Sequence, residues 1–222
     1  MLKIRKLTVG QLQTNCYLVM TGNEALIIDP GDDADYILRI IADEGIAPTK
    51  VIATHGDYDH ILAVTELKLA YQIPFLMHKE DEFLLKRMSA SAAHFGKIVS
   101  DPPPKIDKYL KEGESLKIAR LHAPGVQATG GQGNYKLKIV HTSGHTPGSI
   151  SLYSKVGKAV FVGDVIFAGG GMGRTDFAYS NRKDLLDSVG KLLKLPEDTV
   201  VYSGHGEETT VKRCQQFFAK LR

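Results

Sequence analysis

The sequence has little cysteine and no tryptophan. Its two cysteines, Cys16 and Cys214, lie near opposite ends of the 222-residue chain, and no Cys-x-x-Cys pair is present. Two cysteines cannot build a disulfide framework, and cytosolic chains rarely need one. We therefore expect both residues to be free, buried thiols.

Long apolar runs are also absent. The longest have the length of a β-strand, far below the roughly 20 residues of a membrane-spanning helix. The residues from Met1 to Leu7 alternate in polarity and do not form the apolar centre of a signal peptide. We expect no membrane association and a cytoplasmic location.

The charged residues form no basic stripe with interleaved aromatic residues. The formal net charge is +3 and the two signs are mixed along the chain, so we expect no nucleic-acid partner. An apolar content of 43% with 24% charged residues is typical of a chain with a proper core. We expect a single domain over residues 1–222, and the sequence indicates no particular oligomeric state.

The pattern of apolar residues predicts an initial group of three strands, followed by strands and helices in alternation. The predicted strands cover residues 3–9, 15–20, 25–29, 50–53, 73–77, 115–119, 135–140, 149–153, 159–162 and 199–202. The predicted helices cover residues 33–43, 61–71, 79–95, 181–195 and 207–221. Asp32 or Asp33 is expected to cap the first helix, and Ser180 or Asn181 the fourth. A glycine-rich stretch over 125–133 is expected to form a hairpin tip.

Each half of the sequence therefore runs from several strands into helix, strand and helix, although no residue repeat relates the halves. Such alternation is typical of the α/β class. Two halves of this kind bury their apolar faces when their sheets pack face to face with the helices outside. We predict this four-layer αββα sandwich, which some schemes count as α+β.

Four side chains that can ligate a metal lie within six residues, at His55, Asp57, Asp59 and His60. They follow an apolar run and precede an apolar-periodic stretch, which indicates a strand end, a short loop and a helix start. Side chains on such a loop converge, and two imidazoles with two carboxylates suit one or two divalent cations. The alternative is a turn in which Asp59 or His60 caps the next helix and His55 donates to a backbone carbonyl.

Three more candidate ligands, His145, Asp164 and His205, each follow an apolar strand and have glycine beside them. Glycine allows close backbone approach, so these side chains can be held at a crowded centre. Each alone is also compatible with an ordinary turn residue. The remaining histidines are expected to be surface or core residues, and they are His78, His94, His122 and His141.

The order of these motifs resembles that of the metallo-β-lactamase superfamily over nearly the whole chain. The matching stretches are Thr14 to Tyr17, Leu26 to Gly31, Thr54 to His60, Gly144 to Gly148, Gly163-Asp164 and Ser203 to Gly206. The resemblance implies the αββα fold with a dinuclear metal site at the top of the two sheets. By motif it places His55, the residue at 57 and His145 in a first site, Asp59, His60 and His205 in a second site, and Asp164 between the two metals.

The resemblance also implies a hydrolytic mechanism. A hydroxide between the metals would attack a carbonyl that one metal polarises, and Asp59 would orient or deprotonate the water. The run Gly173 to Phe177 resembles the compact glyoxalase II-like hydrolases and the related persulfide dioxygenases, and the ending Ser203 to Thr210 resembles the hydrolases. The resemblance implies a small-molecule substrate, a thioester such as an S-acyl glutathione. Zinc is the expected metal, with iron or manganese as alternatives. Arg174 and Asp176 are expected to form an ion pair that stiffens their loop.

Asp57 departs from the family pattern, which usually has histidine at this place. Aspartate is a shorter and harder ligand and adds negative charge, so three outcomes are open. Asp57 binds a metal directly or through water, or the first site stays weak or empty, or the centre is lost. Because a fold does not fix the substrate, a lactone, ester or phosphodiester hydrolase and an iron-dependent persulfide dioxygenase are alternatives to thioester hydrolysis. Asp57 adds a fourth alternative, a catalytically impaired binding protein.

Overall fold

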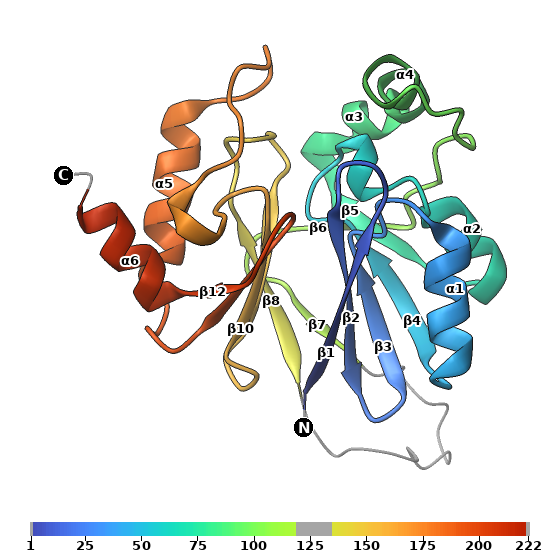
Figure 1. The fold of residues 1–222 in the computed structure, drawn as a ribbon, viewed down its shortest axis with the longest axis horizontal. Helices are drawn as coiled ribbons and strands as arrows, with labels where there is room; N and C mark the ends of the chain where they lie inside the picture. Colours follow the sequence, from blue (N-terminus) through green and yellow to red (C-terminus); the bar gives the residue numbers. More distant parts are fainter. Residues whose placement is uncertain (1, 119–134, 221–222) are drawn as a thin grey trace.

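The computed structural model describes residues 2–118 and 135–220. Two six-stranded sheets pack face to face, and helices cover the outer face of each (Figure 1). The first sheet contains β1 to β6 and the second β7 to β12, so each sheet is built from one continuous half of the chain. The predicted four-layer αββα sandwich is confirmed.

The first sheet begins as an antiparallel meander and continues with parallel strands. Its strands are β1 (Lys3–Val9), β2 (Thr14–Thr21), β3 (Glu24–Ile28), β4 (Ala47–Ile52), β5 (Phe75–His78) and β6 (Lys108–Leu110). A parallel pair needs a crossover connection. Between β3 and β4 it contains α1 (Ala34–Asp43), and between β4 and β5 it contains α2 (Val64–Tyr71).

The second sheet is antiparallel except for one pair. Its strands are β7 (Ser115–Lys117), β8 (Lys136–His141), β9 (Ile150–Ser154), β10 (Ala159–Gly163), β11 (Val200–Ser203) and β12 (Thr209–Thr210). β10 and β11 run parallel, and their crossover contains α5 (Arg182–Leu192). α6 (Val211–Ala219) follows β12, and β6 and β12 are short strands that the sequence did not predict.

The core consists of three apolar layers, and β2 shows how the sequence alternates between two of them. Tyr17 and Val19 point toward the second sheet, where they pack among Ile139 and Phe161. Leu18 on the opposite face of the strand packs with the layer beneath α1 and α2. Successive side chains of a strand point to opposite faces, so a strand with a layer on each side is apolar at every position. The third layer lies between the second sheet and the helices α5 and α6.

One predicted helix is wrong as a continuous element. Residues 79–95 form η2 (Lys79–Asp81), α3 (Glu82–Lys86), α4 (Met88–Ser91) and most of η3 (Ala92–Gly96), a π-helical turn. α3 and α4 are separated at Arg87, whose φ of −97° and ψ of 0° lie outside the helical range. The separate turns allow Asp81 to face the protein interior, where it is fully buried.

The predicted cap of the first helix is also wrong in its chemistry. Asp33 occupies the position before α1, but it has φ 52° and its side chain makes no capping hydrogen bond. Its carboxylate accepts instead from the backbone N–H of Gly10 at 2.8 Å. Asn181 does cap α5 as expected, since its Oδ1 accepts from the N–H groups of Lys183 and Asp184.

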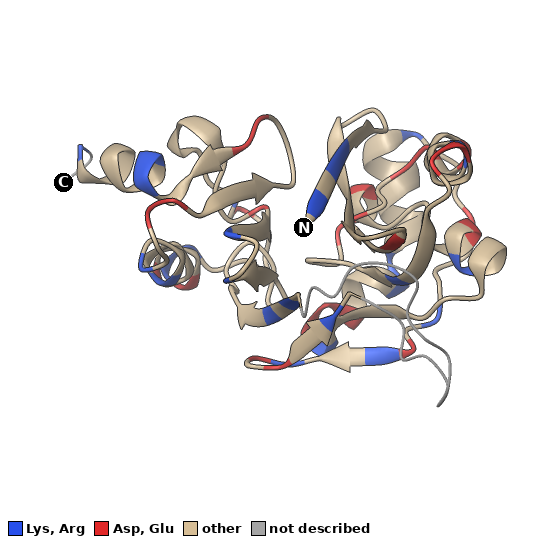
Figure 2. Cartoon of the chain, turned by 90° about the horizontal axis from the view of Figure 1, so that it is seen from below, with Lys and Arg blue, Asp and Glu red and all other residues tan. Residues whose placement is uncertain are grey.

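Other expectations can be compared directly. Cys16 and Cys214 are free and buried, as predicted. The glycine-rich stretch 125–133 and His122 lie outside the described residues. Within the described part, no helix is long and apolar enough to cross a membrane. Figure 2 shows both signs of charge spread over the two halves of the molecule, with basic residues gathered along β1.

Candidate metal centre

The predicted ligands of the first loop lie directly beyond the end of β4. His55 and His60 are buried with 1% and 0% of their surface exposed, and Asp59 and His60 belong to the short turn η1 (Tyr58–His60). His60 does not cap the following helix α2, whose first residue is Val64. The loop therefore directs its imidazoles into the protein, as the metal interpretation predicts.

The other three predicted ligands follow β8, β10 and β11 of the second sheet and reach the same place. Glycine makes this approach possible. A Cβ atom on Gly163 would lie 2.4 Å from Thr54 Oγ1, and one on Gly204 would lie 2.2 Å from Asp164 Oδ1. Close packing thus requires glycine beside Asp164, against the first loop, and beside His205, against Asp164 and His60.

The seven predicted side chains form two groups of possible ligands, with Asp164 between them. His55, Asp57 and His145 offer atoms within 4.8 Å of one another, and so do Asp59, His60 and His205. In the first group Asp57 Oδ2 lies 3.1 Å from His145 Nε2 and 3.8 Å from His55 Nε2. In the second group the Nε2 atoms of His60 and His205 are 3.4 Å apart.

Asp164 faces both groups. Its Oδ1 lies 3.6 Å from His60 Nε2, while its Oδ2 lies 3.6 Å from His205 Nε2 and 3.9 Å from His145 Nε2. A carboxylate has two oxygens and can contact two cations, which one imidazole nitrogen cannot do. The position of Asp164 agrees with the bridging role that the family resemblance implies.

All four imidazoles place Nδ1 against an oxygen and leave Nε2 facing the centre. The contacts are His55 with Thr54 Oγ1 at 3.0 Å, His60 with Asp29 Oδ2 at 3.2 Å, His145 with the Arg174 carbonyl at 2.9 Å and His205 with the Leu12 carbonyl at 3.0 Å. At His55, His145 and His205 the contact is a hydrogen bond, and an Nδ1–H that donates outward fixes the tautomer in which Nε2 carries a lone pair. His60 Nδ1 faces Asp29 as an ion pair without hydrogen-bond geometry. Ligating histidines in metalloproteins are oriented in this way.

Unsatisfied buried atoms test whether the residues fit a metal. His55 Nε2 and Asp164 Oδ1 are buried and have no hydrogen-bond partner among the described residues. Such groups are costly unless a ligand completes them. An imidazole nitrogen and carboxylate oxygens are suitable donors for zinc, iron or manganese, so the residues present fit a divalent metal.

The pKa values of the imidazoles show the field at the centre. Burial beside other histidines holds the pKa of His55 well below its usual range. Burial alone would also lower the pKa of His60, but Asp59 and the neighbouring carboxylates raise it to about 10. His145 likewise is buried, yet its hydrogen bond to Asp57 and the nearby carboxylates raise its pKa to about 9. The carboxylates therefore create a negative site, where a cation would replace the protons.

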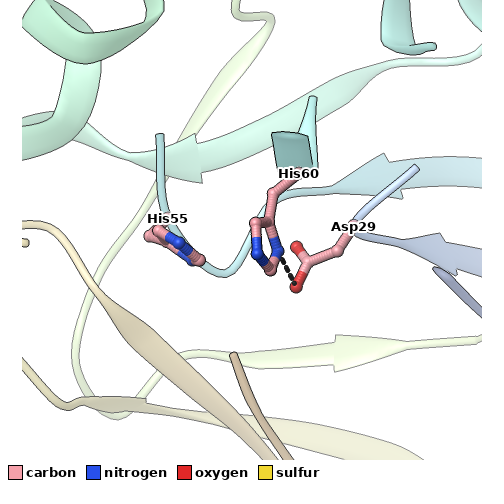
Figure 3. Close-up of side chains that lie close together, drawn as sticks. All are labelled: Asp29, His55 and His60. Atoms are coloured by element: carbon pink, nitrogen blue, oxygen red, sulfur yellow. Dashed lines mark ion pairs between the residues drawn. The ribbon is translucent and has the colours of Figure 1, made fainter. Parts of the chain in front are cut away.

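Sequence reasoning missed the roles of three supporting residues. Asp29, at the end of β3, accepts from the N–H and the hydroxyl of Thr54 at 2.7 Å each and also contacts His60 (Figure 3). Thr14 donates to Asp59 Oδ2 at 3.1 Å. Asp81 contacts both loops of the first ligand group. A strand-end aspartate before Pro30-Gly31 was a usable signal for Asp29, whereas Asp81 lay within a predicted helix and gave none.

A cavity of about 580 Å³ opens beside the centre and contains Asp57, Asp59, His145, Asp164 and His205 in its lining. Aromatic side chains form much of its wall, and they are Tyr58, Phe95, Phe167, Phe177 and Tyr179. Arg174 reaches this wall and forms the expected ion pair with Asp176, through hydrogen bonds of 2.7 and 2.6 Å.

The histidines that were not expected to be ligands lie apart from this centre where they are described. His78 and His141 stack on each other with ring centroids 4.5 Å apart, at the ends of β5 and β8. His94 lies in η3 and contacts Phe95. None of these three belongs to either ligand group of the centre.

Comparison with known proteins gives the same assignment. The family model described as "Metallo-beta-lactamase superfamily" matches residues 9–205. "Probable metallo-hydrolase YqgX" of Bacillus subtilis (strain 168) is 34% identical over 211 residues, covering 95% of this chain and 93% of that protein. "Hydroxyacylglutathione hydrolase GloC" of Haemophilus influenzae is 32% identical over 228 residues, covering 97% and 98%.

A solved structure shares both the fold and the extent of the chain. The crystal structure of TTHA1623 in a di-iron-bound form superposes with a TM-score of 0.82 at 32% identity, covering 96% of this chain and 98% of that one. The match to the family extends over most of the sequence and includes all seven residues that the fold gathers at the centre. The chain belongs to the metallo-beta-lactamase superfamily.

Proposed function

We propose that the protein is a metal-dependent hydrolase of thioesters, with an S-acyl glutathione as the representative substrate. The observation that carries this proposal is the pair of ligand groups with Asp164 between them, which lies in the lining of a cavity large enough for a small molecule. The relative named hydroxyacylglutathione hydrolase supports the same reaction class.

The seven predicted ligands would hold the metal, and either one or two ions fit the donor set. When bound, a divalent cation acidifies water and polarises a carbonyl oxygen. Zinc suits the two imidazoles of each group, while the three carboxylates also favour iron or manganese. The di-iron form of TTHA1623 supports iron as a candidate.

Asp59 is the residue placed to orient the attacking water. Burial would raise its pKa, but His60 and His205 lower it to about 2. With a metal bound, Asp59 would orient or deprotonate the water, and Thr14 fixes one of its oxygens at 3.1 Å.

The thiolate leaving group needs little assistance from the protein. A thiolate leaves readily, so hydrolysis of a thioester needs no strong general acid. Tyr179 lines the cavity, but burial and the charge of Asp57 raise its pKa, which makes the phenol a poor proton donor. A site with an orienting carboxylate, and with no evident acid among the described residues, favours a thioester over an amide.

The proposal is tested by loading the purified protein separately with zinc, iron and manganese and supplying S-lactoylglutathione, an oxygen ester, a lactone and a phosphodiester in parallel. We expect loss of thioester absorbance with at least one metal, and loss of that activity in Asp164→Asn. Cleavage of another substrate without the thioester would move the assignment to that substrate. Binding without turnover of any of them would favour the impaired binding protein.

A further inference from the structure

Asp81 is a fully buried carboxylate that belongs to neither ligand group. It lies at the end of η2, directly after β5 of the first sheet. Burying a charged side chain is costly unless hydrogen bonds compensate for the lost water. Asp81 accepts three such bonds, and their donors identify what it does.

The three donors belong to the two loops that supply the first metal site. Asp81 Oδ2 accepts from the N–H of Gly56 at 2.9 Å and from the Thr146 hydroxyl at 2.6 Å. Asp81 Oδ1 accepts from the N–H of Gly148 at 2.6 Å. Gly56 stands between the candidate ligands His55 and Asp57, and Thr146 directly follows His145. One rigid carboxylate thus sets the distance between loops that come from different sheets.

The two glycines allow the loops to approach closely enough to donate. A Cβ atom on Gly56 would lie 2.9 Å from the Asp81 carbonyl oxygen, and one on Gly148 would lie 2.7 Å from Asp81 Cγ. Both distances are shorter than real Cβ contacts. The sequence therefore keeps a glycine at each place where the backbone meets this carboxylate.

The second metal site has other supports. Asp29 holds His60, Thr14 holds Asp59, and the Leu12 carbonyl holds His205. The hydrogen bonds of Asp81 to Gly56, Thr146 and Gly148 reach none of these supports. Asp29 serves both sites, because it also accepts from Thr54, whose hydroxyl contacts His55. Changes at Asp81 and at Thr14 should therefore disturb different sites.

We propose that Asp81 is a positioning residue for the first metal site. Its carboxylate holds in place the two loops that carry the ligands His55, Asp57 and His145. The inference rests on the metal centre of the proposed function, but it does not depend on which substrate is hydrolysed. Groups that orient metal ligands typically contribute about tenfold to a hundredfold in metal affinity.

The test is a Co²⁺ titration of the metal-free chain, followed by absorption and metal content. Asn has the shape of Asp, but its NH₂ group would face an N–H or hydroxyl donor. We expect Asp81→Asn to lose one ion, or to bind one ion about tenfold to a hundredfold more weakly, with the other ion unchanged. Thr14→Val is the matched control for the second site and should weaken the other ion. Metal content and affinity unchanged by Asp81→Asn would overturn the proposal.

Double variants identify which ion is lost. Adding Asp57→Ala to Asp81→Asn should affect only the ion that Asp81→Asn has already weakened or removed, whereas adding Asp59→Ala should remove the other ion. Loss of that other ion on adding Asp57→Ala would show that Asp81 does not act through the first site and would overturn the proposal.

A second pair of variants guards against misfolding of Asp81→Asn. Thr146→Val removes one of the three donors from Asp81, and Thr146→Ser retains it. We expect Thr146→Val to weaken the same ion and Thr146→Ser to restore its affinity, with the circular dichroism spectrum unchanged. Equal binding by the two variants would contradict the proposal. Metal binding is measured without turnover, so the two proposals can fail separately. If the wild-type protein does not hydrolyse the thioester but Asp81→Asn still loses one ion, the thioester function is rejected and the role of Asp81 is supported.

Discussion

Asp57 stands where the family usually has histidine, and its carboxylate lies with the two histidines of the first ligand group. Its Oδ2 lies 3.1 Å from His145 Nε2 and 3.8 Å from His55 Nε2, so the first group is assembled rather than dispersed. The side chain is partly exposed at the cavity, unlike the two histidines. This geometry favours binding by Asp57 over loss of the centre.

The identity of this ligand should control metal affinity. We expect Asp57→His to bind Zn²⁺ at the first site more tightly, because an imidazole is a softer ligand that suits Zn²⁺ better than a carboxylate. Asp57→Asn keeps the size but loses the charge, and should bind that ion more weakly than the wild type. Isothermal titration with Zn²⁺ measures both effects, and equal affinities in all three proteins would show that residue 57 is not a ligand.

The imidazole pKa values predict opposite pH dependences for the metal-free and metal-bound chains. The pKa is about 10 for His60 and about 9 for His145, against about 6.5 in an unfolded chain. A histidine whose pKa is raised by folding adds to the free energy of unfolding. This contribution is fully present below pH about 6.5 and is lost as the pH rises through the pKa of the histidine in the folded protein. The metal-free protein should therefore lose stability from pH 6.5 to 9, while metal binding, which needs neutral imidazoles, should strengthen.

Thermal unfolding with and without Zn²⁺ from pH 6 to 9 measures this relation. The difference in unfolding temperature between the Zn²⁺-bound and the metal-free protein should increase as the pH rises. Variant His60→Ala, which lacks one of the raised groups, should show a smaller change across the interval. A difference that narrows with pH would contradict the assignment of these histidines as ligands.

At the scale of elements, the loop before His145 is fixed by its contact with α5. Gly144 has φ +134°, and a Cβ atom there would lie 2.2 Å from the backbone nitrogen of Leu185. The N–H of Asn181, the capping residue of α5, donates to the Gly144 carbonyl at 2.8 Å. The start of the helix and the ligand loop therefore move together.

We expect Gly144→Ala to lower the free energy of unfolding by roughly 3 kcal/mol or more, because both the backbone angle and the packing must change. Gly190 in the same helix is the matched control, since a Cβ atom there would meet no packed neighbour within 4 Å among the described residues. Gly190→Ala should raise the free energy of unfolding by roughly 0.5 to 1 kcal/mol. Urea denaturation of both variants measures the two changes in the free energy of unfolding. A small decrease for Gly144→Ala would show that the loop can rearrange to accommodate the side chain.

The segment after β10 contributes an aromatic wall to the cavity. Phe177 stacks on Tyr179 with centroids 5.1 Å apart, and the Arg174 guanidinium lies 4.2 Å from the Phe177 ring. We expect Phe177→Ala to raise KM for the thioester severalfold with little change in kcat, because the ring contacts substrate away from the reacting bond. Val156→Ala, on an exposed turn, is the control. A fall in kcat alone would place Phe177 in the chemical step.

The sequence predicted elements and ligands where the signals were local. Glycine next to a strand end located Asp164 and His205, and apolar periodicity located α5 together with its cap Asn181. The roles of Asp29 and Asp81 could not be read in this way, because their partners lie 25 to 67 residues away. The helix predicted over 79–95 failed for a related reason, since burial of Asp81 outweighs the helical preference of its neighbours.

At the scale of the whole molecule, the ligands link the two sheets. His55 to His60 follow β4 of the first sheet, whereas His145, Asp164 and His205 follow strands of the second. A bound ion should therefore stabilise the packing of one half on the other. An ion present at 100 times its Kd adds about 2.7 kcal/mol to the free energy of unfolding.

Removing the metal with a chelator should accordingly lower the unfolding midpoint, and adding it back should restore the original value. The double variant His55→Ala, His60→Ala is the control and should not respond to either step. A chelator effect of equal size in that variant would mean that the stabilising ion binds elsewhere.

The division of the strands into two consecutive sets has a consequence for synthesis of the chain. All strands of the first sheet have been made by Leu110, before any strand of the second. Until the later strands emerge from the ribosome, the inner face of the first sheet, with Tyr17, Leu26 and Ile52, has no cover. A nascent chain paused near this point should therefore be prone to aggregation and should bind chaperones. It cannot yet bind a metal through both ligand groups, because the ligands of the second sheet have not been made.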